Sequence, residues 1–458
     1  MPRNSRCTKG TGALALESNS AVLEDRCKSR RSRRSFAGLS WILCWLVFAG
    51  SPLASQSLPT AAPGEVGLSA ERLERIDAIL QGHVEREELA GAVALIARRG
   101  RVAHFTTHGR MAGGADNGTP MRRDALFGIA SMTKPVTSTA VMMLYEEDRL
   151  ALTDPVAKYI PELAGLQVAV VEAGQQGPDA AFTEVPAARE VTILDLLRHT
   201  SGFTYDFLDP GPVGKLYREA LQPDALATLQ DFVGKLAELP LTAQPGTAFH
   251  YGVSTDVLGY IVEVISEQTL DQFFAERIFR PLGMHDTAFY VPKDKADRLV
   301  TLYAVGEDGR VAPGVRPFFR RYDALPALLS GGGGLVSTVA DYARFLQMLL
   351  GGGKLDGVRL LSRKTVELMT TDHLAGTTQP RVAPGYGFGL GFAVRVDLAE
   401  AAKPGSVGEY AWSGIFNTVF FVDPQEELFA ILMTQTIPFG HLNWSERFKA
   451  LVYHSIDD

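Results

Sequence analysis

The first periodic segment of the chain predicts a helix followed by a β-hairpin. Apolar residues between positions 73 and 80 fall on one stripe of a helix, and Ser69 is suited to cap its N-terminus. Two apolar runs, 91–97 and 102–105, then flank the turn dipeptide Arg99-Gly100. The pattern therefore predicts one amphipathic helix and two antiparallel strands.

Between about residues 120 and 290, the apolar positions follow mainly the period of helices and predict a helical lobe. Further along, Ser337 is suited to cap a helix that ends at Gly351. The clearest helical segments of the lobe are 193–197, 226–239, 256–265 and 270–279.

Beyond residue 385 the period changes to two. Bulky side chains alternate with glycines over 386–392, which predicts a strand with one bare face that another backbone can approach closely. Segments 419–422 and 428–433 predict a second hairpin, and 443–456 can close the chain as a helix. Strands from both chain ends around a helical block predict an α/β fold of the α+β kind. Its antiparallel sheet is flanked by N- and C-terminal helices and carries an inserted all-helical lobe, roughly 120–290.

The N-terminal residues have the composition of an export signal. Four arginines between positions 30 and 34 precede the apolar run 36–50 and a stretch of small residues. Arg33 and Arg34 also fit a twin-arginine signal, which directs the export of folded proteins. We therefore expect a periplasmic or secreted protein without stable membrane association after signal cleavage. An uncleaved N-terminal membrane anchor is the alternative, because the apolar run approaches spanning length.

These features divide the chain into three parts. We expect residues 1–55 to contain the export signal behind an over-extended start, 56–68 to be a lead-in, and 69–458 to form one large domain. The sequence does not specify an oligomeric state.

Charge and cysteine content narrow the function classes. The chain has a net charge of −7, although the residues before 56 hold nine Lys and Arg against three Asp and Glu. The exported part is therefore acidic, which argues against nucleic acid as a partner. Cys7, Cys27 and Cys44 all precede the expected cleavage zone. The exported part would therefore contain no disulfide, catalytic thiol or thiolate metal site. We expect no cofactor and no metal, because His104 and His108 lack the carboxylate pattern of a zinc site.

The strongest chemical signal is the motif Ser131-Met132-Thr133-Lys134. It is the only Ser-x-x-Lys in the chain, and it stands where the apolar segment 125–130 runs into the helical pattern 135–147. If Ser131 opens that helix, Lys134 lies one turn further on the same face, and the first-turn N–H groups point at the same place. Such a pair suits attack on a carbonyl and formation of an acyl-enzyme.

Four further stretches accompany this motif and establish a family resemblance. They are LLRHTSG at 196–202, PGTAFHY at 245–251, RPLGM at 280–284 and SGGGG at 330–334. Over roughly residues 60–455, the chain resembles the serine β-lactamase and penicillin-recognising superfamily, in which Ser-x-x-Lys is a named motif. It is most similar to the class C branch and to the related family VIII carboxylesterases.

The resemblance implies a role for each motif. Ser131 is the nucleophile, and Lys134 assists in removing its proton, which requires an amine that itself gives up a proton readily. Tyr251 matches the tyrosine of the second motif, whose phenol relays a proton to and from the leaving group. The third motif falls on the substrate-binding residues Trp412-Ser413-Gly414 at a strand edge. The next N–H, of Ile415, would join that of Ser131 in an oxyanion hole.

Two positions depart from the β-lactamases of this superfamily. Val253 stands in the substrate site where they have an amide, and Trp412 replaces the lysine that holds the carboxylate of a β-lactam. Trp-x-Gly is a variant of the esterase branch, so the resemblance implies an exported carboxylesterase for small-molecule esters with short or medium acyl groups. A β-lactamase or D-alanyl-D-alanine carboxypeptidase is the nearest alternative. A non-catalytic cell-wall binding module is an alternative of a different class.

Other residues have simpler interpretations. His199 fits a structural position, because the chain has no Gly-x-Ser-x-Gly elbow that would suit a Ser-His-Asp triad. Trp412 could also be a packing residue without substrate contact. The aromatic residues of 386–392 fit the core better than a substrate platform.

Overall fold

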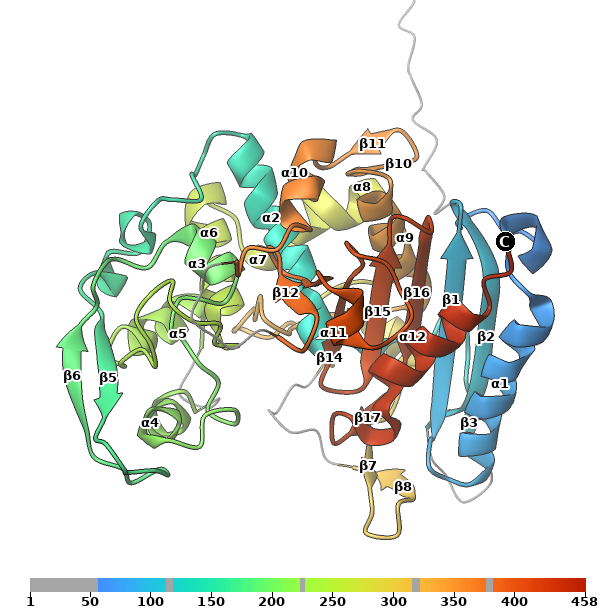
Figure 1. Ribbon diagram of the computed structural model, residues 1–458, viewed down its shortest axis with the longest axis horizontal. Coiled ribbons are helices and arrows are strands. Elements are labelled where there is room, and N and C mark those ends of the chain that lie inside the picture. Colours follow the sequence, from blue (N-terminus) through green and yellow to red (C-terminus); the bar gives the residue numbers. More distant parts are fainter. Residues whose placement is uncertain (1–56, 113–117, 223–226, 315–321, 376–381) are drawn as a thin grey trace, which may run out of the picture. The chain divides into compact units, whose positions relative to one another are not determined.

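The computed structural model describes residues 57–112, 118–222, 227–314, 322–375 and 382–458 (Figure 1). The predicted export signal at 1–55 and its three cysteines lie outside the described residues. Within those ranges, no helix has both the length and the apolar character needed to cross a bilayer.

The central antiparallel sheet draws its strands from both ends of the described chain, in the order β12-β13-β14-β15-β16-β1-β2-β3 (Figure 1). The pairing of β1 with β16, from Val93 opposite Met433 to Arg98 opposite Leu428, joins the two sets of strands. This architecture confirms the predicted fold class. The strands are β1 (Gly91–Arg98), β2 (Arg101–Ala112), β3 (Thr119–Pro120), β12 (Tyr386–Phe388), β13 (Ala393–Arg395), β14 (Tyr410–Gly414), β15 (Thr418–Asp423) and β16 (Leu428–Met433).

Helices α1 (Ala70–Glu85) and α12 (Trp444–His454) cover one face of this sheet. Side chains of a strand alternate between the two faces. On β1, Ala94 and Ile96 pack with α1 and α12, whereas Leu95 faces the second core on the other side. Ser69 caps α1 as predicted, because its side chain accepts a hydrogen bond from the next turn.

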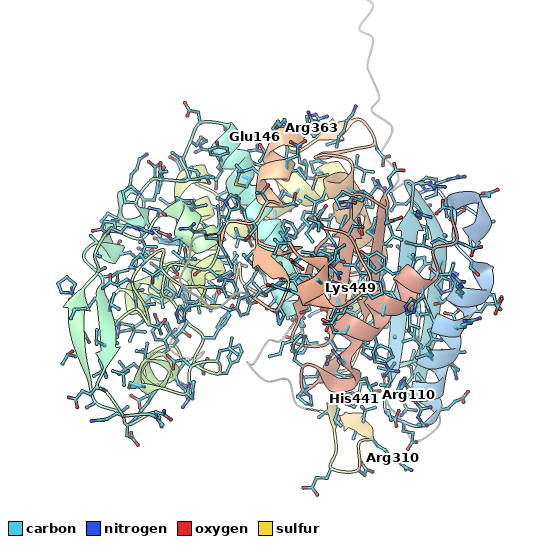
Figure 2. The ribbon with its side chains drawn as sticks, in the orientation of Figure 1. Arg110, Glu146, Arg310, Arg363, His441 and Lys449 are labelled. Carbon is cyan, nitrogen blue, oxygen red and sulfur yellow. The ribbon has the colours of Figure 1, made fainter. Side chains whose placement is uncertain are left out.

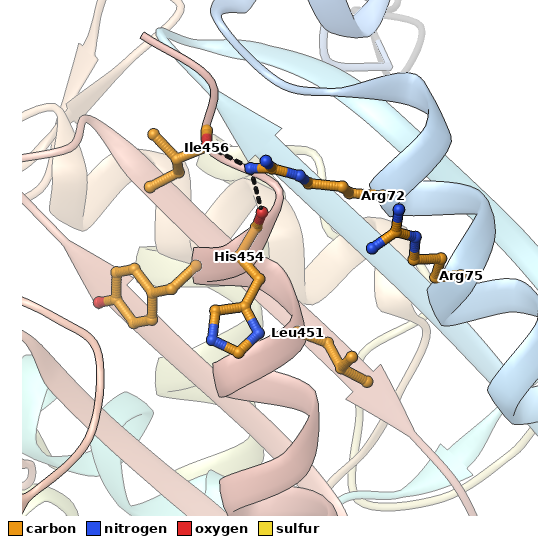
Figure 3. Close-up of a pocket in the computed structure, with 6 residues that line it drawn as sticks. Arg72, Arg75, Leu451, His454 and Ile456 are labelled. Atoms are coloured by element: carbon orange, nitrogen blue, oxygen red, sulfur yellow. Dashed lines mark hydrogen bonds between the residues drawn. The ribbon is translucent and has the colours of Figure 1, made fainter.

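Polar contacts tie the two covering helices to each other and to the sheet. Arg72 Nη1 of α1 donates to the carbonyl oxygens of His454 at 2.9 Å and Ile456 at 3.3 Å, at the edge of a surface pocket of about 400 Å³ (Figure 3). Lys449 of α12 (Figure 2) forms a buried ion pair with Glu409, which also pairs with Arg395 at 3.2 Å. The first contact holds α1 against the end of α12, and the second holds α12 on the sheet.

The helical region between β3 and β12 is built around α2 (Thr133–Glu146), which is buried from Thr133 to Leu144. Its apolar side chains belong to the core on the second face of the sheet. The other helices after α2 are α3 (Ile193–Leu197), α4 (Pro212–Ala220), α5 (Leu229–Leu236), α6 (Ser254–Ser266), α7 (Leu270–Phe274), α8 (Arg280–Leu282), α9 (Val339–Leu350), α10 (Arg363–Met369) and α11 (Leu398–Ala401).

Short strands also occur in this region, which the apolar pattern did not predict. A hairpin of β5 and β6 lies within the otherwise helical lobe, at the left edge of Figure 1. The short strands of this region are β4 (Phe127–Gly128), β5 (Gln167–Val171), β6 (Phe182–Pro186), β7 (Tyr303–Val305), β8 (Val311–Pro313), β9 (Val336–Ser337), β10 (Lys354–Leu355) and β11 (Val358–Arg359). A further short strand, β17 (Thr436–Ile437), follows β16 and pairs with β7.

Two predicted helix boundaries differ from the structure. Thr338, not Ser337, caps α9, because Ser337 ends β9 and its hydroxyl pairs with that of Thr287 at 2.8 Å. Thr228 caps α5 in a capping box with Asp231, so this helix is shorter than the predicted segment 226–239.

The alternating segment 386–392 is a strand and a turn, not one strand. β12 ends at Phe388 and pairs back onto β13, where Phe388 lies opposite Ala393. Gly391 at φ +104° supports the reversal, because this backbone conformation strongly favours glycine. The glycine face of this segment allows another backbone to approach closely, as predicted, because a Cβ at Gly389 would collide with the carbonyl oxygen of Met369.

Candidate active site

The backbone turns sharply just before Ser131. Ala130 to Met132 form a 3₁₀ turn directly before α2, and Met132 N donates to the carbonyl oxygen of Ile129 at 3.0 Å. Ala130 has φ +44°, a left-handed conformation that costs on the order of 1–3 kcal/mol in a residue other than glycine. Ser131 is half-buried at this turn, whereas the residues on either side of it are buried.

Lys134 is 1% exposed and makes three hydrogen bonds with its amine. Nζ donates to the carbonyl oxygen of Gly332 at 2.7 Å, to Tyr205 OH at 3.0 Å and to Ser131 Oγ at 3.3 Å. A lysine ammonium has three donors, and each has an oxygen acceptor here. The structure thus brings Ser131 and Lys134 together as the sequence predicted.

The glycine tract 330–334 supplies one of these acceptors and is itself held by α6 and α2. Asp256 of α6 accepts hydrogen bonds from Ser330 Oγ at 2.5 Å and from Gly332 N at 3.0 Å. Thr137 of α2 donates to the carbonyl oxygen of Gly331 at 2.7 Å. A Cβ at Gly332 would collide with Asp256, so only glycine fits this path. The tract therefore fixes the Gly332 carbonyl beside Lys134.

Two tyrosines face Lys134 in different ways. Lys134 Nζ lies 4.7 Å from the ring centroid of Tyr251, in cation–π range, but it bonds to the hydroxyl of Tyr205. Among the described residues, the buried hydroxyl of Tyr251 has no hydrogen-bond partner. A buried unpaired hydroxyl costs about 1–3 kcal/mol, and this one is available to hydrogen-bond to a bound molecule.

Tyr205 is a site residue that the sequence analysis missed. It follows the 196–202 motif, and its ring stacks on Phe207 at a centroid distance of 5.0 Å. Its position shortly after a recognised motif was the available signal. Nothing local to Tyr205 shows that its hydroxyl reaches Lys134, because that contact depends on how α2 packs in the lobe.

The surroundings of Lys134 shift its pKa in opposite directions. Burial is the largest single influence and lowers the pKa of Lys134. Tyr205, Tyr251 and Asp256 together outweigh burial and hold the pKa of this amine above its ordinary value. The pKa of Tyr205 is also raised, chiefly by burial. This direction is opposite to the one that a ready proton acceptor needs, and the role of Lys134 as the base stays a prediction.

The third motif lies on an edge of β14 that is only partly paired. Residues Trp412 to Gly414 pair with β15, but the pairing with β13 extends only over Tyr410 and Ala411. Gly414 lies so close to the turn before Ser131 that a Cβ would collide with the carbonyl oxygen of Ile129. Ile415, the next residue, packs in the apolar cluster that contains Ala130. Its predicted oxyanion role is compatible with this placement and stays a prediction.

An aromatic wall adjoins Tyr251. Trp412 lies 5.2 Å from Tyr251 and 5.3 Å from Phe388, measured between ring centroids. Phe388 is fully buried, as expected for a core residue. The indole Nε1 of Trp412 is buried without a hydrogen-bond partner among the described residues. Trp412 therefore presents an apolar, uncharged surface beside Tyr251.

His199 packs behind Tyr251 at a ring distance of 4.9 Å. Burial, reinforced by the charge of Lys134, holds the pKa of His199 well below its ordinary value, so the imidazole is neutral. Within the described part of the chain, its Nδ1 has no hydrogen-bond partner, and thus no carboxylate orients it. This environment fits the structural role predicted for His199.

Val253 and Ser413 differ in how they reach the site. Val253 precedes α6, is 5% exposed and packs in the large core. Ser413 is half-buried on the free edge of β14. Neither placement tests substrate contact, so both roles remain predictions.

The two histidines of β2 serve a different part of the fold. His104 and His108 both direct Nε2 at one oxygen of Asp77 on α1, at 3.0 and 3.1 Å. No group of three or more His, Cys, Asp or Glu side chains suited to a metal ion occurs in the described ranges.

A model of the family described as Beta-lactamase matches residues 76–445. This chain belongs to the Beta-lactamase family. The family identifies it as a serine hydrolase. Protein Rv1367c of Mycobacterium tuberculosis is 39% identical over 368 residues, which cover 76% of this chain and 86% of the relative. Esterase EstB of Burkholderia gladioli is 30% identical over 387 residues, covering 80% of this chain and 91% of the esterase.

A solved structure supports the same assignment for this Beta-lactamase family member. The structure of EstCE1, titled a hydrolase with promiscuous acyltransferase activity, superposes with a TM-score of 0.68 at 27% identity. The match covers 85% of this chain and 99% of EstCE1. The two proteins therefore share one fold over most of their length.

Proposed function

We propose that this chain is a carboxylesterase that cleaves short or medium acyl esters through an acyl-Ser131 intermediate. The observation that carries the proposal is the Ser131 hydroxyl bonded to buried Lys134, next to the unpaired hydroxyl of Tyr251. The names of EstB and EstCE1 support an ester as the substrate.

In the acylation step, Ser131 Oγ attacks the ester carbonyl carbon and forms a tetrahedral intermediate. The serine proton moves to the base form of the Lys134–Tyr205 pair, which carries one proton fewer than in the resting site. The N–H groups of Ser131 and Ile415 stabilise the oxyanion. When the ester C–O bond breaks, the leaving oxygen receives its proton through the Tyr251 hydroxyl, the donor that has no partner before substrate binds.

Deacylation repeats these steps with water in place of the alcohol. Water attacks the acyl carbon, and its proton passes to Tyr251 and then to Lys134. Ser131 then leaves with its proton restored. The products are a carboxylic acid, an alcohol and the free enzyme. Each proton taken from a nucleophile is thus returned to a leaving group.

The residues around the site favour a neutral substrate. A β-lactam carries a carboxylate, and Trp412 offers it an aromatic ring in place of a cation. Leaving a buried polar group unpaired costs about 1–3 kcal/mol, and a charge costs more. An aliphatic ester needs only the oxyanion donors and an apolar wall, which Trp412 and Ile415 supply.

We expect p-nitrophenyl butyrate to be cleaved with a kcat/KM about 100-fold or more above that of a chromogenic cephalosporin, because the missing partners penalise the anionic lactam. Both rates are measured with the same enzyme preparation, and Ser131→Ala gives the background. The double variant Val253→Asn, Trp412→Lys should shift the ratio toward the cephalosporin. A cephalosporin, or an acyl-D-alanyl-D-alanine peptide, that exceeds every ester would replace the esterase assignment with one of the alternatives.

The rate of ester cleavage should rise with pH and respond to Tyr205. Because the pKa of Lys134 lies above its ordinary value, the base form is scarce at neutral pH and grows as pH increases. Tyr205→Phe removes an influence that raises this pKa and leaves the opposing effect of burial. Its profile of kcat/KM, measured from about pH 6 to 9.5, should therefore move to lower pH.

The Tyr205→Phe variant keeps the ring that stacks on Phe207, so the comparison isolates the hydroxyl. An unchanged midpoint in this variant would show that Tyr205 does not set the protonation of Lys134.

The proposal includes export from the cytoplasm. Its support is the order of Arg33, Arg34, the apolar run 36–50 and the small residues that follow.

A further inference from the structure

The turn that carries Ile415 is a three-residue hairpin loop between β14 and β15. Asn417 N donates to the carbonyl oxygen of Gly414 at 2.9 Å, and Asn417 has a left-handed backbone with φ +60°. Three-residue hairpin loops commonly end in such a left-handed residue, and asparagine tolerates this conformation better than most residues. The bond that closes the turn is made by the N–H of Asn417, two residues after Ile415.

The side chain of Asn417 fastens this turn to the segment after β16. It is 3% exposed, and its Nδ2 donates to the carbonyl oxygens of Thr436 at 2.8 Å and Pro438 at 3.0 Å. Its Oδ1 accepts from Gly440 N at 2.9 Å. Both donors and the acceptor oxygen of one amide are therefore engaged by backbone groups from a separate segment.

Two threonines of the same segment, Thr434 and Thr436, also hydrogen-bond to the turn. Thr434 Oγ1 donates to the carbonyl oxygens of Phe416 and Asn417, each at 3.1 Å, and Thr436 N donates to that of Phe416 at 3.1 Å. Ile415 packs with Ala130, the residue before Ser131, in one apolar cluster. The turn is thus held between a hydrogen-bonded segment on one side and the nucleophile turn on the other.

We propose that Asn417 is a positioning residue that sets the direction of the Ile415 N–H in the oxyanion hole. The inference rests on the proposed esterase function. A left-handed turn residue alone could be glycine, which costs no strain. The buried amide adds rigidity that the turn itself does not need for closure. Donors of an oxyanion hole act through preorganisation, since their energy depends on being aimed where charge develops in the transition state.

Asn417→Gly tests this role, because it keeps the left-handed backbone and removes all three side-chain hydrogen bonds. Asn443→Gly is the matched control, since Asn443 is also left-handed at φ +50° but is exposed and makes no capping bond with its side chain. We measure kcat and KM for p-nitrophenyl butyrate and the inhibition constant of butylboronic acid, whose serine adduct mimics the tetrahedral intermediate. Melting temperatures report on the fold.

For Asn417→Gly we expect kcat to fall about 10- to 100-fold and the boronic acid to bind weaker by a similar factor, with KM changed less than about threefold. Asn443→Gly should match the parent protein. If Asn417→Gly only melts at a lower temperature and keeps kcat and boronate affinity, Asn417 is merely structural and the inference is overturned. A fall confined to KM overturns it equally.

If Asn417→Gly does not fold, Thr434→Val decides, because it removes two hydrogen bonds to the same turn with little change in volume. A joint loss of kcat and boronate affinity supports the inference, and unchanged values overturn it. An unmodified enzyme that neither cleaves esters nor binds the boronic acid would instead refute the proposed function itself.

Discussion

Replacing Ser131 with alanine is expected to abolish ester turnover, by up to about 10⁶-fold. Ser131 accepts a hydrogen bond from Lys134 and lies in the turn that leads into α2. Backbone N–H groups at the start of a helix can stabilise an oxyanion there. Alanine removes the nucleophile and leaves the turn and the core intact. Hydrolysis of p-nitrophenyl butyrate by the purified variant measures the loss.

Ser138→Ala is the matched control for this loss, because Ser138 lies on the same helix and has no place in the proposed mechanism. It should keep activity near that of the parent protein. A Ser131→Ala variant that retains more than about one hundredth of the parent rate would remove Ser131 from the nucleophile role.

Replacing Lys134 with methionine is expected to lower kcat on the order of 10³- to 10⁴-fold, because Lys134 is the group hydrogen-bonded to Ser131 in the proposed proton path. Methionine keeps an unbranched side chain in a site that is 1% exposed, and melting temperature reports whether the fold survives. Tyr251→Phe should also be severe. The double variant should lose much less than the product of the two single losses, since both residues serve one proton path.

Two results would contradict the shared proton path of Lys134 and Tyr251. Strictly multiplicative losses would show that Lys134 and Tyr251 act in separate steps. A Tyr251→Phe variant with a near-normal rate would show that the unpaired hydroxyl is not the proton donor to the leaving group.

Local sequence predicted the part of the site that is local in the chain. Ser131 and Lys134 lie one helical turn apart, and this spacing alone brings their side chains to the same face. The hairpins around Arg99-Gly100 and 423–426 were predicted for the same reason, since turn chemistry and alternation act over a few residues.

Contacts made by tertiary packing could not be predicted in this way. The acceptors of Lys134 include Tyr205 and the carbonyl oxygen of Gly332, which are far away in the sequence. The direction in which the pKa of Lys134 shifts depends on such partners, and the motif alone does not contain them. The prediction that 386–392 is one strand was wrong for a related reason. The segment alternates perfectly, but Gly391 has a left-handed backbone that reverses the chain.

In the proposed mechanism, Ser131 forms the covalent acyl-enzyme. The most direct test of this step is to react the purified protein with a fluorophosphonate and to identify the modified peptide by mass spectrometry. We expect a single adduct on Ser131 that appears together with the loss of esterase activity. An adduct on another serine with equal loss of activity, or full inhibition without any serine adduct, would contradict it.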